Sequence, residues 1–252
     1  MMRSSNPALQ EKRFTTNGVG STTTDERMTV SGAVNKSFFL IGLVFVTAYF
    51  SWTSSFPEGW AAGAPAQVGV WFLPSLLVGF VLSLIIIFKA NTAPYLSPVY
   101  AIAEGVVLGG LSAMFEARYP GVVLQAVFCT LATFLSMLFA YKSGLLKATE
   151  TFKRVVVTAT LGIFVVYLID FVMNLMGNPM PYLHDSSPMS IGISAVITCV
   201  AALNLILDFD FIEQGAAQGA PKHMEWYSAF GLLVTLVWLY MEFLRLLGKS
   251  RR

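Results

Sequence analysis

Long apolar stretches separated by short polar breaks dominate the pattern of this chain. Seven of these stretches approach the roughly 20 residues that a helix needs to cross about 30 Å of hydrocarbon. Backbone polar groups in lipid need partners within the protein, which favours helices, and the sequence lacks the alternating strand pattern of a membrane barrel. The predicted spans are residues 37–56, 68–88, 98–115, 122–141, 155–176, 190–207 and 226–247.

The breaks between the spans carry turn-forming residues, as in FPEGWAAGAPAQ, EARYPG and GNPMPYLHDSSP. The first 36 residues are polar and rich in Ser and Thr, without the early apolar core of a cleavable signal peptide. We therefore predict a polar cytoplasmic tail over residues 1–36 and one membrane domain over residues 37–252. The expected fold is an all-α polytopic membrane protein, a seven-transmembrane-helix bundle.

Composition agrees with this class. Hydrophobic residues make up 56% of the chain and charged residues 12%, with a mean hydropathy of +0.67. Soluble domains carry about 25% charged residues, so the lipid bilayer is the expected surrounding of this chain. The net charge of +2, without a Lys/Arg-rich block, gives no reason to expect a nucleic-acid partner.

Lys and Arg residues predict the orientation, because they are enriched in cytoplasmic loops. With a cytoplasmic N-terminus, the tail and the residues between the fourth and fifth spans bring most of the cations to that side. Seven crossings then place the C-terminus outside, although a cluster of cations lies there: Arg245, Lys249, Arg251 and Arg252. The predicted location is the inner (plasma) membrane, as a multi-pass protein.

Two acids in the last two apolar stretches carry the strongest functional signal. They are Asp208 in LNLILDFDFIEQG and Glu242 in VWLYMEFLRLLG. A carboxylate among apolar side chains costs several kcal/mol to keep ionised unless it is paired, hydrated or protonated. Such acids suggest proton sensing or cation handling. The competing structural explanations are a helix end that reaches water at Asp208, and a local ion pair between Glu242 and Arg245, three positions later.

Other polar or small residues in the spans allow two interpretations. Glu104 could line a pathway or bond to a neighbouring helix, and Asp170 is placed to reach the membrane interface. Asp210 follows Asp208 and is a further pathway or packing candidate. Acids outside the spans are expected to be solvated. Gly105 and Gly109 give the third span a small-residue face, which predicts close helix packing.

The sequence gives no reason to expect an enzyme or a cofactor. His184 and His223, the two histidines, both lie in predicted loops, which leaves no HExxH or multi-histidine zinc site. No His is placed to activate a serine, and GxSxG is absent. Cys129 and Cys199 lie in apolar runs and are expected to be small hydrophobic side chains within the membrane.

Several motifs together resemble the Bax inhibitor-1 family, also called the transmembrane Bax inhibitor motif family, and in particular its bacterial, YccA-like branch. They cover nearly the whole chain and form a specific combination. The stretches are RSSNPAL, MTVSGAVNKS, SPVYAIAEGVVLGGLS, KATETFKRVVVTATLGIF, LNLILDFDFIEQG and GAPKHMEWYSAFGLLVTLVWLYMEFLRLL.

This resemblance implies seven helices with the last one central, a cytosolic N-terminus and the activity of a pH-sensitive calcium leak channel. In such channels a carboxylate pair on helices six and seven shares a proton, and the matching positions here are Asp208 and Glu242. Glu242 stands where the family has aspartate. Calcium would be the transported ion rather than a cofactor. The alternative is a membrane scaffold or regulator that binds other membrane proteins, such as a protease complex.

Overall fold

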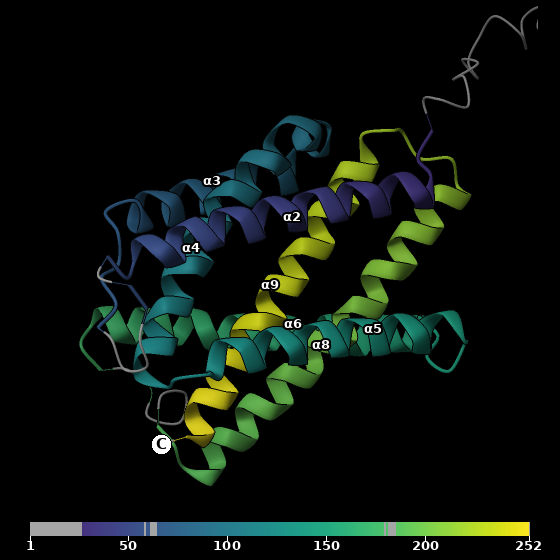
Figure 1. Cartoon of the computed structure of the whole chain (residues 1–252). Coiled ribbons are helices and arrows are strands. Elements are labelled where there is room, and N and C mark those ends of the chain that lie inside the picture. Colours follow the sequence, from purple (N-terminus) through teal and green to yellow (C-terminus); the bar gives the residue numbers. More distant parts are fainter. Residues whose placement is uncertain (1–26, 58, 61–64, 179, 181–184, 252) are drawn as a thin grey trace, which may run out of the picture.

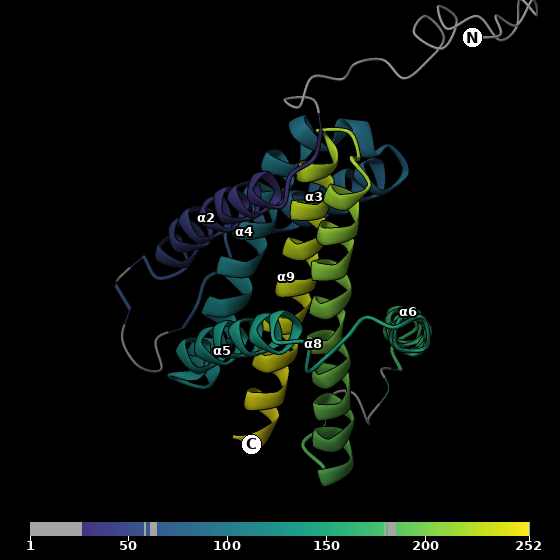
Figure 2. The same ribbon diagram turned by 90° about the vertical axis from the view of Figure 1, so that its right-hand side faces the viewer.

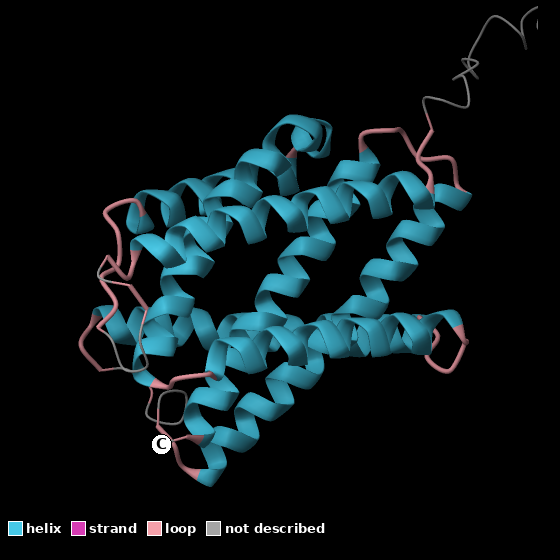
Figure 3. Ribbon diagram, in the orientation of Figure 1, coloured by secondary structure: helices cyan, strands magenta, loops and turns pink. Residues whose placement is uncertain are grey.

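The computed structural model describes residues 27–57, 59–60, 65–178, 180 and 185–251, and these fold into helices without a β-strand (Figure 3). A short 3-10 turn, η3 (Ala90–Thr92), joins two of the helices. The α-helices are α2 (Val30–Ser54), α3 (Phe72–Phe88), α4 (Ala93–Arg118), α5 (Val122–Lys142), α6 (Glu150–Leu175), α8 (Pro188–Ala217) and α9 (Met224–Ser250).

These helices confirm an all-α polytopic membrane fold. Six of them are long and apolar enough to cross a bilayer, and α3 is a shorter apolar helix. Several bounds differ from the predicted ones, most of all the start of α2 and the end of α8. α2 begins at Val30, inside the range expected for the polar tail, of which residues 1–26 lie outside the described part. α8 continues to Ala217, so Asp208 lies inside a helix rather than at its end.

Side-chain caps explain where three of the helices begin. Thr29, Thr149 and Ser187 each have extended backbone and accept a hydrogen bond from an amide in the first helical turn. Such caps satisfy donors that the helix itself leaves free. The caps at Thr29 and Thr149 start helices ahead of the predicted apolar runs, because capping depends on a hydroxyl and not on hydropathy.

α9 is the central helix of the bundle, as the family resemblance implies. It packs against α2, α4, α5 and α8 (Figures 1 and 2). Its contact with α8 is lined by fully buried Leu205, Ile206 and Leu239. On its other side, its own Phe230 packs against Tyr100 of α4 in the core with α2. α6 lies apart from this core, beside α8 (Figure 2).

Close packing between α2 and α4 depends on the predicted small-residue face. A Cβ at Gly105 would lie 2.7 Å from Val44 O, and one at Gly109 would overlap Ala48 O. Both backbone oxygens belong to α2. Small residues at such positions let backbones approach, which is how helices gain van der Waals contact in lipid.

Large apolar side chains cover the outside of the bundle. Phe38, Phe88 and Phe139 are each more than two-thirds exposed. Apolar surface of this extent is far beyond the isolated exposed residues of soluble proteins. It matches a protein whose outer face contacts lipid.

Candidate functional site

Asp208 lies on α8 at its interface with α9. The Thr235 side chain of α9 lies beside the carboxylate, and its hydroxyl donates to Gly231 O at 3.3 Å. The second oxygen, Oδ2, is buried and has no hydrogen-bond partner within the described part of the chain. Leu205 and Phe209 beside it on α8 are both buried. The site is therefore a carboxyl group in apolar surroundings with one weak polar neighbour.

Glu242 lies in a second polar cluster, further along α9, and is 1% exposed. Its Oε1 accepts hydrogen bonds from Tyr167 of α6 at 2.7 Å, Trp238 Nε1 at 3.2 Å and the Arg245 guanidinium at 3.0 Å. Arg245 also stacks over the Tyr167 ring, 4.9 Å from its centroid. Oε2 is buried without a partner among the residues the structure covers.

The structure does not bring Asp208 and Glu242 together as a hydrogen-bonded pair. Thr235, opposite Asp208, and Glu242 are seven positions apart on α9, which is about 10 Å at 1.5 Å per residue. The direct pair expected from the resemblance is therefore replaced by two clusters along one helix. The alternative expected for Glu242, an ion pair with Arg245, is present.

Tyr167→Phe tests the link between α6 and the Glu242 cluster. This change removes the hydroxyl that donates to Oε1 and keeps the ring under Arg245. Hydrogen bonds to charged groups are worth about 1.5–3 kcal/mol, so we expect a loss of that order in unfolding free energy, measured by denaturant titration in detergent. Tyr49→Phe, on the exposed face of α2, is the matched control and should change stability little.

The other predicted acids have more local roles. Glu104 faces Tyr100 on its own helix, and the position of a Cβ on Gly79 of α3 would be 3.6 Å from its Oε2. It thus lies in the packed interface of α3 with α4. Asp170 accepts a hydrogen bond from Met180 N at 3.1 Å. This contact fastens the residues that follow α6, in agreement with a position near the membrane interface.

Asp210 belongs to the end of the bundle where α5, α6 and α8 meet. It forms an ion pair with Lys153 at 2.8 Å and accepts from Gln214 Nε2 at 2.7 Å. Neighbouring Glu213 accepts from Tyr141 OH at 2.5 Å. These carboxylates have polar partners at the helix ends, unlike Asp208.

Two acids assigned to solvated loops are in fact buried, so that prediction is wrong for them. Glu116 is 5% exposed and caps the start of α5 by accepting from Gly121 N at 2.6 Å. Glu225 is fully buried at the start of α9, where it meets the first residues of α2. A search for apolar runs cannot find such residues, because Glu116 and Glu225 lie at helix ends outside those runs. The spacing of Lys222 and Glu225 was the available signal.

No group of three or more His, Cys, Asp or Glu side chains comes together as a metal site in the described ranges. His223 is described, whereas His184 lies outside them. The candidate site therefore consists of single carboxylates on α8 and α9.

The comparisons with known proteins give the family. A search of the curated proteins and a search of the solved structures each found no match. The family model described as "Bax inhibitor 1 like" matches residues 6–252, nearly the whole chain. This chain is therefore a multi-pass membrane protein of the Bax inhibitor-1-like family.

Proposed function

We propose that this protein is a pH-sensitive leak channel for cations, with calcium as the transported ion, Asp208 as its proton-sensitive gate and Glu242 as a fixed negative site. The observation that carries the proposal is the pair of buried carboxylate oxygens without partners, Oδ2 of Asp208 and Oε2 of Glu242. A buried polar atom that lacks a partner costs free energy, so its retention calls for a function.

The proposed gate depends on whether Asp208 carries its proton, since an ionised carboxylate in apolar surroundings costs free energy unless it is paired or hydrated. A protonated Asp208 carries no charge and fits between Leu205 and Phe209. A deprotonated Asp208 favours either separation of α8 from α9 or entry of a cation with its water. Calcium prefers carboxylate and carbonyl oxygens, so it suits such a site.

The two acids would act as two separate sites along the pathway rather than as one pair. Thr235 is a polar side chain beside Asp208, and among the described residues no cation pairs with Asp208, which makes it the group more sensitive to protons. Glu242 has Arg245 beside it, so its ionised form is already compensated in part. We therefore assign the gate to Asp208 and a fixed negative site to Glu242.

Calcium entry into dye-loaded proteoliposomes, measured between about pH 6 and 8, tests this function. We expect the native protein to conduct more calcium at the higher pH, because the gate residue Asp208 is then ionised. Asp208→Asn should remove the pH dependence. Glu242→Gln should lower the flux across the range, since a neutral amide cannot attract a cation.

Asp210→Asn is the matched control. Asp210 lies two positions from Asp208 on the same helix, but it is neither of the two acids assigned to the pathway. It should keep the pH response. Folded, monodisperse protein that gives no flux above empty liposomes would contradict the channel function. Flux that persists unchanged in Asp208→Asn would contradict the role of this residue.

A scaffold or regulator of other membrane proteins is the second candidate. α6 favours the scaffold function, since only 6% of its apolar membrane-spanning stretch is buried and α8 is its principal packing partner. Such a helix leaves most of its surface open to another membrane protein. This candidate would gain support if the liposome assay failed and a partner were captured through α6. Neither candidate requires a catalytic residue or a cofactor, and both assume a cytoplasmic N-terminus in an inner membrane.

A further inference from the structure

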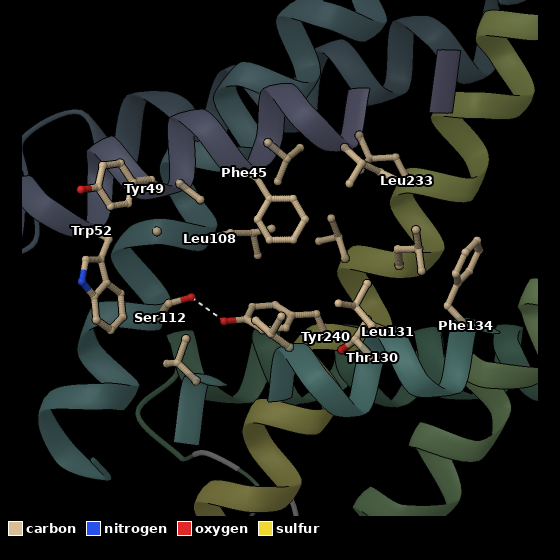
Figure 4. Close-up of a pocket in the computed structure, with 18 of the residues that line it drawn as sticks. Phe45, Tyr49, Trp52, Leu108, Ser112, Thr130, Leu131, Phe134, Leu233 and Tyr240 are labelled. Carbon is tan, nitrogen blue, oxygen red and sulfur yellow. Dashed lines mark hydrogen bonds between the residues drawn. The ribbon is translucent and has the colours of Figure 1, made fainter. Parts of the chain in front are cut away.

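An apolar cavity lies between α2 and α5 in the described part of the bundle. Its volume is about 340 Å³, and α4 and α9 close its inner side. Figure 4 shows Phe45 of α2 facing Thr130 and Leu131 of α5 across it. Polar groups in the wall are largely satisfied: Ser112 and Tyr240 bond to each other at 2.7 Å, and Thr130 donates to Ala126 O at 2.8 Å.

A second cavity of about 820 Å³ continues this space along the same two helices. The two cavities share Phe38, Ile41 and Phe134 as lining residues. The second one reaches the end of α5, where Lys142 and Lys147 lie at its rim. Together they form one groove, which we call the α2–α5 groove, with an apolar interior and a cationic mouth.

The groove is long enough to hold the acyl chain of a membrane lipid. Along α5 the first cavity extends from Val123 to Phe134, about 16 Å at 1.5 Å per residue. The second adds about 12 Å from Phe134 to Lys142. One leaflet is about half of the roughly 30 Å hydrocarbon core, or about 15 Å, which exceeds the distance from Lys142 to Phe134, so an acyl chain that starts at the lysines and crosses one leaflet ends in the apolar cavity.

The charges at the mouth favour an anionic headgroup. Lys142 and Lys147 are exposed there. Of the two acids at the same rim, Asp210 pairs with Lys153, whereas Glu213 accepts from the neutral Tyr141, so the two lysines still leave the mouth with a net positive charge. Cations at a membrane surface attract anionic lipids.

We propose that the α2–α5 groove binds an anionic phospholipid, with one acyl chain in the apolar cavity and the phosphate at Lys142 and Lys147. The bilayer supplies this ligand directly. Phe38, Phe45 and Leu131 on the walls of the groove are each 45–67% exposed, so its walls continue into the lipid-facing surface. The bound chain would contact Tyr240 and Leu236 of α9, and thereby support the central helix.

Photolabelling of the purified full-length protein tests this site. The probe is phosphatidylglycerol with a diazirine at the end of one acyl chain, in detergent micelles, followed by peptide mapping with mass spectrometry. We expect saturable labelling of α2 and α5. Unlabelled phosphatidylglycerol should compete, whereas the same probe with a phosphatidylcholine headgroup should label weakly.

Two sets of variants separate the chain site from the headgroup site. Val127→Trp fills the apolar cavity and should lower labelling roughly tenfold, because each excluded methylene removes about 0.8 kcal/mol. Leu124→Trp adds the same ring to the exposed face of α5 and should have no effect. Lys142→Gln and Lys147→Gln should each lower the preference for the anionic probe roughly fivefold.

Labelling that does not saturate, or that spreads equally over α3 and α6, would overturn the proposal. Equal labelling by the two headgroups would overturn the role of the lysines. If Val127→Trp does not yield folded protein, Ala48→Phe on the α2 wall provides the same block. Unchanged labelling in the folded variant would show that the chain does not enter the cavity.

Discussion

Replacement of Glu225 by alanine is expected to destabilise the protein more than any other single change considered for this chain. Glu225 is fully buried and joins the start of α2 to the start of α9. It accepts from Thr29 N at 2.8 Å and from Thr29 Oγ1 at 2.9 Å, and it pairs with Lys36 and with Lys222, the latter at 3.1 Å.

Loss of this carboxylate leaves a backbone amide and two ammonium groups without their anion. Removal of one partner from a buried charged network costs about 3–5 kcal/mol, since the remaining charges are not compensated. The carboxylate is also tightly packed against α2, because it fills the position that a Cβ on Gly32 would occupy. We therefore expect Glu225→Ala to lower the unfolding free energy by about that amount.

Thermal or denaturant unfolding in detergent measures this effect, with tryptophan fluorescence or circular dichroism as the signal. Glu150→Ala is the matched control. Its side chain is 78% exposed and 3.6 Å from Lys153, so its removal should cost less than about 1 kcal/mol. Equal stability of the two variants would show that the Glu225 network does not hold α2 and α9 together.

Gly109→Ala should destabilise the bundle, whereas the same substitution at Gly42 should not. A Cβ on Gly109 would overlap Ala48 O and lie 2.7 Å from Ser51 Cβ, so α2 and α4 must separate to admit it. Overpacking of this kind costs about 1–3 kcal/mol. Much of the rigid contact of α4 with α2 should be lost.

Gly42 lies on α2 with nothing near the position of its Cβ. Alanine there removes the helix penalty of glycine, which is about 1 kcal/mol, so the variant should be as stable as the parent or slightly more stable. The unfolding midpoints of the two variants, measured in the same detergent, compare their stabilities. A Gly109→Ala protein as stable as Gly42→Ala would mean that α2 and α4 are free to move apart.

The pattern of apolar residues was sufficient for the membrane class and for most of the helices. Transfer of side chains into hydrocarbon depends on residue type and run length, and both can be read along the chain. The small-residue face at Gly105 and Gly109 was predictable for the same reason. The bounds of α2 and α8 were not, because a hydroxyl cap starts α2 early, and α8 continues past its apolar run through Asp208, Asp210 and Glu213.

The motifs along the chain also identify the family, and the apolar runs around Asp208 and Glu242 mark both acids as unusual. The partners of these acids follow from the packing of the helices. Thr235 faces Asp208, while Tyr167 and Arg245 surround Glu242. Partners across helices depend on the rotation and crossing of α6, α8 and α9, which spacing along one helix does not specify. The same reason explains why Glu225, polar by sequence, is fully buried at the junction of α2 with α9.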